Sequence, residues 1–268
     1  MNGSRFTSRQ RTGGEAEHRA AVVLRSVREI AKLREAGRVV AQVLDALEAV
    51  VAVGMATAEL DAIAERLIRQ AGAVPTFKGY HGFPASICVS VNDEVVHGIP
   101  GERRLAAGDI VSCDVGATLE GYIGDSARTF ALPPVAPETD RLLRVTRDAL
   151  DAAIRVARAD GRVGDVSAAV QGPVEAAGYS VVRQFCGHGV GTSMHEEPQV
   201  PNHGHAGHGP RLRVGMVIAI EPMVNAGAFA VQVDANGWTV RTGDGSRSAH
   251  FEHTVAILEG GPAILTLP

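Results

Sequence analysis

The sequence has few lysines, few aromatic residues and no long apolar run. Lysine occurs only at positions 32 and 78 among 26 basic residues, and aromatic residues make up 4% of the 268 positions. The formal net charge of −4 is too small to imply a polyanionic partner, so direct binding of nucleic acid is not predicted. No run approaches the roughly 18 apolar residues of a membrane span, and no signal-peptide core precedes the fold. We therefore expect a cytoplasmic chain with no membrane partner.

Cysteines are also scarce. The three present, Cys88, Cys113 and Cys186, are odd in number and show no C-x-x-C spacing. This pattern indicates neither a disulfide framework nor a structural zinc ribbon, and it favours a reducing compartment.

The periodicity of apolar residues indicates two similar halves. Residues 1–25 are polar and lack such periodicity until position 20, which predicts a flexible N-terminal tail. An S-x-x-E capping box at Ser26 opens a long amphipathic helix, and Thr57 is expected to cap a short one. After a proline cluster the same order returns, with helices expected at 138–159 and 165–177. Two pseudo-repeats, about 26–132 and 138–268, would place two sheets side by side.

A hairpin at 109–130 carries two carboxylates where a fold normally places apolar side chains. With the turn centred between Leu119 and Glu120, Asp114 and Asp125 would face each other across the strand pair. Two like charges in that arrangement are unfavourable unless a cation lies between them. Taken alone, a turn cap and a solvated aspartate at a strand edge would be the commoner interpretation.

Other ligand-type residues favour a metal site. His188 lies in FCGHGVG and His195 in MHEEP, while Glu221 and Glu252 each lie at one end of an apolar, β-branched run. Such runs predict buried strands, in which an unpaired carboxylate would cost several kcal/mol. The candidates come from both halves, so a site at their join could draw ligands from each.

The chain from Ser26 onward resembles the type I methionine aminopeptidases. Five motifs carry the resemblance and fall in the family's order: YHGFPASICVSVNDEVVHGIP, GDIVSCDVGATLEGYIGDSARTF, FCGHGVGTSMHEEPQV, GMVIAIEPMV and SAHFEHTVAIL. The resemblance implies an α+β pita-bread fold, in which two pseudo-symmetric halves of antiparallel sheet are covered by helices. Residues 26–268 would then form a single catalytic domain.

The resemblance also implies roles for individual residues. His97 and His195 would be catalytic histidines that also contact the substrate, and Glu221 would be both a ligand and the proton shuttle. Asp125 and Glu252 would bridge two ions. The implied metal ligands are Asp114, Asp125, His188, Glu221 and Glu252. The implied pocket for the methionine side chain is Tyr80, Phe83, Cys88, Met194 and Trp238.

Four carboxylates and one imidazole form a largely hard donor set that balances two dications and suits Co, Mn, Fe or Zn. The resemblance implies hydrolytic removal of the initiator methionine from nascent proteins and peptides, through a dinuclear centre and a bridging hydroxide. Expected partners are N-terminal Met peptides and nascent chains, with the ribosome as a further candidate. We expect a monomer.

Two other readings stay open on the sequence. One is a proline-directed peptidase or a creatinase-like hydrolase of the same fold, although such enzymes usually carry a larger N-terminal domain. The other is a catalytically inactive binding protein. Relatives of that kind lose metal ligands, whereas all five positions are filled here.

Overall fold

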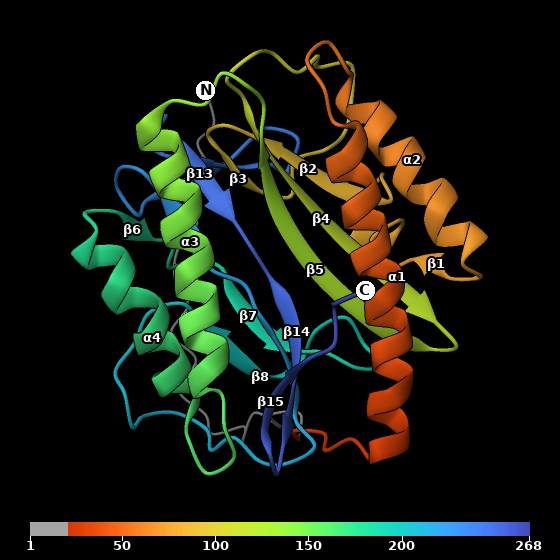
Figure 1. Cartoon of the computed structure of the whole chain (residues 1–268), viewed down its shortest axis with the longest axis vertical. Helices are drawn as coiled ribbons and strands as arrows, with labels where there is room; N and C mark the ends of the chain where they lie inside the picture. Colours follow the sequence, from red (N-terminus) through yellow and green to blue (C-terminus); the bar gives the residue numbers. More distant parts are fainter. Residues whose placement is uncertain (1–20) are drawn as a thin grey trace, which may run out of the picture.

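The computed structural model describes residues 21–268, and Figure 1 shows helices lying over antiparallel strands. The expected tail therefore lies mostly outside the described residues, and of its last positions Arg25 is buried. The helices are α1 (Val27–Val50), α2 (Thr57–Gln70), α3 (Pro137–Val156) and α4 (Val163–Ala176), with a 3-10 turn at Tyr80–Gly82. The strands are β1 (Val74–Pro75), β2 (Ile87–Val91), β3 (Glu94–Val96), β4 (Ile110–Leu119), β5 (Tyr122–Ala131), β6 (Ser180–Val181), β7 (Cys186–Gly189), β8 (Glu196–Pro201), β9 (Val217–Ile220), β10 (Met223–Asn225), β11 (Val231–Val233), β12 (Val240–Thr242), β13 (Ser248–His250), β14 (His253–Leu258) and β15 (Gly261–Ile264).

Each pair of helices covers its own sheet. In Figure 1, α1 and α2 lie over the strands at 74–131, whereas α3 and α4 lie over strands from the later part of the chain. The first sheet has the order β1-β4-β2 with β5 on β4, and the largest later sheet has the order β15-β14-β9-β7-β8. Separate apolar clusters fill the two layers, with Leu44 and Val111 in the first and Leu150 and Ile218 in the second. Two three-stranded sheets, β13-β10-β6 and β11-β12-β3, complete the described fold.

The two helices of the first half begin in different ways. The capping box predicted for α1 is confirmed, since the Ser26 side chain accepts from Glu29 N and the Glu29 carboxylate accepts from Ser26 N at 2.8 Å. The expected cap of α2 at Thr57 is wrong. Ala56 is the N-cap, and the Glu59 carboxylate accepts its N–H at 2.7 Å. The Thr57 hydroxyl instead donates to the Gly101 carbonyl at 3.1 Å.

The central hairpin forms as expected, but in a different register. Leu119 pairs with Tyr122, so the turn residues are Glu120 and Gly121, with φ of 48° and 81°. A two-residue turn with positive φ at both positions matches the twist of the strands, and glycine suits the second position. The predicted direct pairing of Asp114 with Asp125 is therefore wrong. Asp125 pairs with Gly116, which places the two aspartates diagonally on one face.

Gly124 serves helix packing and not a turn. A Cβ on this residue would lie 2.6 Å from Gly37 N and 2.7 Å from Ala36 C, both in the backbone of α1. A Cβ on Gly37 would in turn collide with the Leu265 carbonyl oxygen. The first helix can therefore approach both β5 and the C-terminal segment closely only because neither glycine has a side chain.

Gly124→Ala is expected to lower the free energy of unfolding by about 1–3 kcal/mol, because the atoms that the new methyl group meets belong to a helix backbone. Urea or thermal unfolding measures the effect. Gly172→Ala in α4 is the control, since nothing lies within 4 Å of its added Cβ. We expect the control to be neutral or slightly stabilising. Equal stability of Gly124→Ala and the parent chain would contradict the close packing of α1 on β5.

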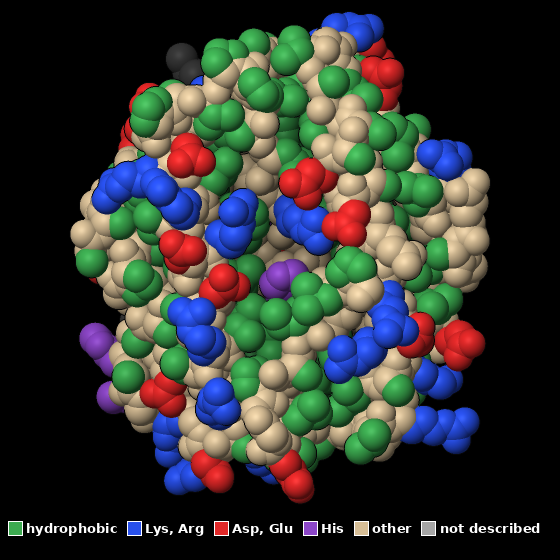
Figure 2. All heavy atoms as spheres, in the orientation of Figure 1, with side chains coloured by type: hydrophobic (Ala, Val, Ile, Leu, Met, Phe, Trp, Pro, Cys, Tyr) green, Lys and Arg blue, Asp and Glu red, His purple; other side chains and the backbone are tan. Residues whose placement is uncertain are grey.

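The helix-covered face carries charges of both signs without one dominant patch (Figure 2). Figure 2 also shows a hollow near the middle of this face. Ion pairs also join helix to sheet, for example from Arg128 on β5 to Asp45 of α1 at 2.6 Å. Over the described residues, none of the helices is both long and apolar enough for a membrane span.

Candidate metal centre

Every site residue that the sequence predicts lines one cavity of about 380 Å³. Its polar lining includes the four predicted carboxylates and the predicted histidines, and its other lining residues include the predicted pocket residues. Asp114 lies on β4 and Asp125 on β5, whereas Glu221 follows β9 and Glu252 precedes β14. The fold thus brings both halves of the chain to one cavity.

Several carboxylate oxygens of this cavity are buried and lack partners. Asp125 and Glu252 are each 2% exposed. Among the described residues, Asp114 Oδ1, Asp125 Oδ1 and Glu252 Oε1 are buried without a hydrogen-bond partner. Buried, unpaired acidic oxygens are costly, and a bound cation would satisfy them. This donor set fits a divalent metal.

His188 on β7 is oriented toward the carboxylates. Its Nδ1 lies 2.9 Å from the Gly189 carbonyl oxygen, which accepts the Nδ1 proton. Nε2 then faces the cavity, 3.6 Å from Asp125 Oδ2 and 3.5 Å from Glu221 Oε1. One ligand atom each from Asp125, His188 and Glu252 lies within 4.8 Å of the others. Fixing one ring nitrogen on a backbone carbonyl is how proteins prepare the other nitrogen for a metal.

Burial shifts the pKa of each carboxylate of the cavity upward. Burial raises the pKa of Asp125 to about 7. Burial, followed by the charges of neighbouring carboxylates, raises the pKa of Asp114, Glu221 and Glu252 well above the usual range. Without a cation, these acids compete for protons near neutral pH, and a metal would displace those protons.

Backbone and hydroxyl hydrogen bonds join the two halves beside the carboxylates. Thr254 Oγ1 donates to the Asp125 carbonyl at 2.7 Å and accepts from Asp125 N at 3.3 Å. Glu252 N donates to the Ala127 carbonyl at 2.9 Å, and Ser126 Oγ donates to the Glu252 carbonyl at 2.5 Å. We call residues 125–127 and 252–254 the half-to-half seam. It fixes Asp125 relative to Glu252.

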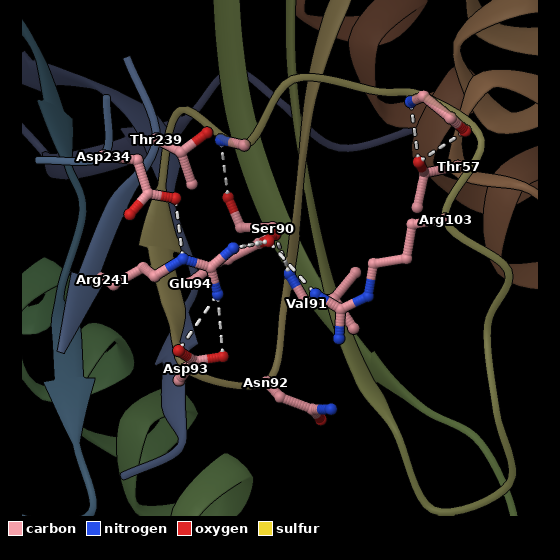
Figure 3. Close-up of polar contacts among 12 residues, drawn as sticks. Thr57, Ser90, Val91, Asn92, Asp93, Glu94, Arg103, Asp234, Thr239 and Arg241 are labelled. Carbon is pink, nitrogen blue, oxygen red and sulfur yellow. Dashed lines mark hydrogen bonds and ion pairs between the residues drawn. The ribbon is translucent and has the colours of Figure 1, made fainter. Parts of the chain in front are cut away.

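A polar network supports the strand that leads to His97 (Figure 3). Glu94 Oε1 accepts from Arg103 at 3.1 Å and from Arg241 at 2.8 Å, and Glu94 Oε2 accepts from Val91 N at 2.7 Å. Arg241 on β12 also pairs with Asp234 at 2.7 Å. These contacts hold β3 against β12.

His97, which follows β3, takes a positive φ of 58°. Its ring packs edge-on against Phe185 and Trp238, with centroids 5.6 and 6.5 Å away. Burial lowers the pKa of His97 to about 4, so the neutral ring is present at neutral pH.

His195 lies in the loop between β7 and β8. Its ring centroid is 4.3 Å from that of His188, and its Nδ1 lies 2.8 Å from the Tyr80 hydroxyl. Burial lowers the pKa of His195. A neutral imidazole held by Tyr80 can present Nε2 to a ligand in the cavity.

The residues that line the cavity include some that the sequence predicted and others that it did not. Phe83 and Trp238 pack edge-to-face with centroids 5.1 Å apart. Strand alternation could have indicated His250 and Met223, because each lies two residues from a predicted ligand. Phe185 and Cys186 are the first two residues of the FCGHGVG motif that contains His188. The further lining residues not predicted are Phe77, His81, Val96, Phe185, Cys186, Met223 and His250.

Comparison with known proteins agrees with this geometry. The family model described as metallopeptidase family M24 matches residues 31–259. Methionine aminopeptidase 1 of Bacillus subtilis is 51% identical over 245 residues, covering 91% of this chain and 99% of the relative. The crystal structure of a methionine aminopeptidase from Thermotoga maritima superposes with a TM-score of 0.91 at 43% identity, covering 92% of this chain and 100% of that one. A prolidase from Pyrococcus furiosus shares the fold at a TM-score of 0.74 and 21% identity, covering 91% of this chain and 65% of its own.

The fold of these neighbours confirms the predicted pita-bread architecture, in which two helix-covered antiparallel sheets enclose an acidic cavity. That fold and this donor set define a metal-dependent hydrolase. The chain belongs to metallopeptidase family M24, and within it to the methionine aminopeptidases.

Proposed function

We propose that this enzyme removes the N-terminal methionine from nascent proteins and peptides. The observation that carries the proposal is the set of buried, unpartnered carboxylates around His188, placed directly beside an apolar pocket. Thioether side chains pack well against aromatic rings and sulfur, which the pocket offers in Phe83, Trp238 and Cys88. We also propose that residues 26–132 and 138–268 are repeats within one catalytic domain. The protein would act as a cytoplasmic monomer and would meet its substrates at the ribosome.

Asp114, Asp125, His188, Glu221 and Glu252 would hold two divalent ions, with Asp125 and Glu252 shared between them. In this assignment each unpartnered acidic oxygen of the cavity acquires a cation. The bound pair would supply a bridging hydroxide at neutral pH and polarise the scissile carbonyl. The donor set suits Co, Mn, Fe or Zn.

The other side chains would bind the substrate and move protons. His195, neutral and held by Tyr80, would donate a hydrogen bond to the oxyanion that develops on the first peptide carbonyl. His97, which also lines the cavity, would contact the scissile amide. Glu221 would take up the proton of the nucleophile at a carboxylate oxygen and deliver it to the leaving amine.

Glu221→Gln is expected to lower kcat by about 100- to 10,000-fold, because the amide cannot take up a proton. Metal content measured by atomic spectroscopy separates this effect from loss of a ligand. Glu197→Gln, which changes a carboxylate that does not line the cavity, is the control. Full turnover by a Glu221→Gln variant that retains its metal would exclude the shuttle role.

Trp238→Ala is expected to reduce discrimination between Met and Leu at the substrate N-terminus by about tenfold, because it removes one wall of the pocket. The ratio of kcat/KM for two tetrapeptides that differ only in the first residue measures this. Phe229→Ala removes an exposed ring outside the cavity and serves as the control. If the ratio of kcat/KM for the two peptides did not change, Trp238 would not form part of the pocket for the methionine side chain.

The proposal as a whole is tested with two peptides, Met-Ala-Ser-Lys and Ala-Pro-Ala-Lys. Mass spectrometry follows both with metal-stripped protein and after addition of Co, Mn, Fe or Zn. Loss of Met alone, dependent on metal, is the expected result. Release of Ala from the second peptide would favour a proline-directed enzyme instead. Cleavage of neither peptide by folded, metal-loaded protein would favour a binding protein.

A further inference from the structure

A buried ion pair joins the segment before α1 to the loop that carries His195. Arg25 Nη2 lies 2.5 Å from both carboxylate oxygens of Glu196, and the two side chains are 6% and 12% exposed. The main chain of Arg25 is also fixed, since its N–H donates to the Gly215 carbonyl at 2.7 Å. Arg25 is therefore fixed both at its main chain and at its guanidinium. Its partner Glu196 lies 171 positions away in the sequence.

Glu196 ties its own loop together. Its Oε1 accepts N–H groups from Thr192 at 3.0 Å and from Ser193 at 3.1 Å, in addition to the arginine. A Cβ on Gly191 would collide with the Arg25 guanidinium, so the arginine lies directly against this backbone. The Gly191 carbonyl accepts from Ile123 N at 2.9 Å, which links the loop to β5 as well. We call residues 191–196 the histidine loop.

The histidine loop delivers two side chains to the cavity. Met194 is 7% exposed and His195 contacts the Tyr80 hydroxyl, and both line the cavity. Arg25 and Glu196 do not line it. Arg25 also pairs with Glu29 at 3.7 Å, outside the loop. The direct route from this ion pair to the cavity is the loop backbone, which Glu196 binds just before Met194 and His195.

We propose that Arg25 and Glu196 are positioning residues, which set the place of His195 and Met194 in the active site and so make the segment before α1 part of the catalytic apparatus. The effect on turnover rests on the proposed function, whereas the effect on loop order does not. Removal of the arginine leaves Glu196 buried without its cation, and the carboxylate can then gain water only if the loop moves. Displacement of a catalytic group by about 1 Å costs on the order of 100-fold in rate.

The test uses full-length protein with Arg25→Met, Glu196→Gln, the double variant and Arg25→Lys. Hydrogen exchange followed by mass spectrometry measures the amides of residues 190–197, and metal content, kcat and KM are measured on the same samples. Arg38→Met is the control, because it removes an exposed ion pair with Glu35 from the helix that follows. If Arg25→Met does not fold, Arg25→Lys and Glu196→Gln provide the same comparison.

We expect Arg25→Met and Glu196→Gln each to speed exchange in residues 190–197 about tenfold or more, with metal content unchanged. We expect kcat to fall about 10- to 100-fold with a smaller change in KM. The double variant should be no worse than the worse single variant, because the two residues act as one unit. Arg25→Lys should recover part of the loss, since lysine keeps the charge but not the planar fork.

Exchange and kcat at parent levels in Arg25→Met would overturn the proposal, and so would strictly additive losses in the double variant. If the parent protein did not cleave Met-Ala-Ser-Lys at all, the proposed function would fail. The exchange data would still decide whether Arg25 orders the histidine loop.

Discussion

Asp125→Asn is expected to lower kcat/KM for an N-terminal Met peptide by at least about 100-fold and to reduce the metal bound per chain. Loss of a partner outside the ligand shell alone costs about 10- to 100-fold in metal affinity or activity, so loss of Asp125 as the proposed bridging ligand should cost at least as much. Peptide cleavage and atomic spectroscopy on the same preparation measure both effects. Asp148→Asn, which changes an exposed aspartate of α3, is the control.

The same variant separates loss of function from loss of fold. Asp125 is buried, and its ionised form is unfavourable in the metal-free protein, as its pKa of about 7 indicates. Asparagine has nearly the same shape and no charge, so the metal-free variant should be more stable than the metal-free parent at pH 8. A variant with full metal and full activity would remove Asp125 from the ligand set.

Metal removal is expected to destabilise the protein more at pH 8 than at pH 6. An aspartate of the unfolded chain titrates near 4, whereas burial raises the pKa of Asp125 to about 7 in the folded, metal-free protein. Between these values the folded state holds a proton that the unfolded state has released. The stability of the metal-free protein therefore falls as pH rises through this window.

From Asp125 alone the loss between pH 6 and pH 8 is on the order of 1 kcal/mol, because the raised pKa lies midway between the two. For a chain of this size we expect the melting temperature of the metal-free protein to be a few degrees lower at pH 8. The bound metal should reverse the trend, since its affinity rises as the ligands lose protons. Scanning calorimetry with and without chelator measures the difference, and Asp125→Asn should lack the part due to this residue. If metal removal lowered stability more at pH 6 than at pH 8, the assignment of the buried carboxylates as the metal site would be contradicted.

Local signals in the sequence predicted the helices and the ligand-type residues, because these signals depend on neighbours a few positions apart. The capping box at Ser26 and Glu29 and the carboxylates at the ends of the runs near Glu221 and Glu252 are of this kind. The hairpin was predicted with its turn one residue too early. Glycine adopts a positive φ readily, which favours Gly121 in the second turn position and so decides the register. In this register Asp125 pairs with Gly116.

Features that join distant segments could not be predicted from spacing. Nothing near Arg25 indicates that its partner is Glu196, and nothing near Gly124 indicates that α1 will pack on it. Both depend on how the two halves meet, which is a property of the assembled sheets. His250 is an intermediate case, since strand alternation relates it to Glu252 once the strand is known.

The half-to-half seam has a consequence for the order of folding. Asp125 and Thr254 are 129 positions apart, so the loop between them must close before their hydrogen bonds can form. Contacts of such long range form late and slow the folding of a chain. A metal that needs ligands from both sides of the seam can bind only after this step. We therefore expect metal to leave the rate of folding nearly unchanged and to slow unfolding, so that the ion protects the finished enzyme without guiding its assembly.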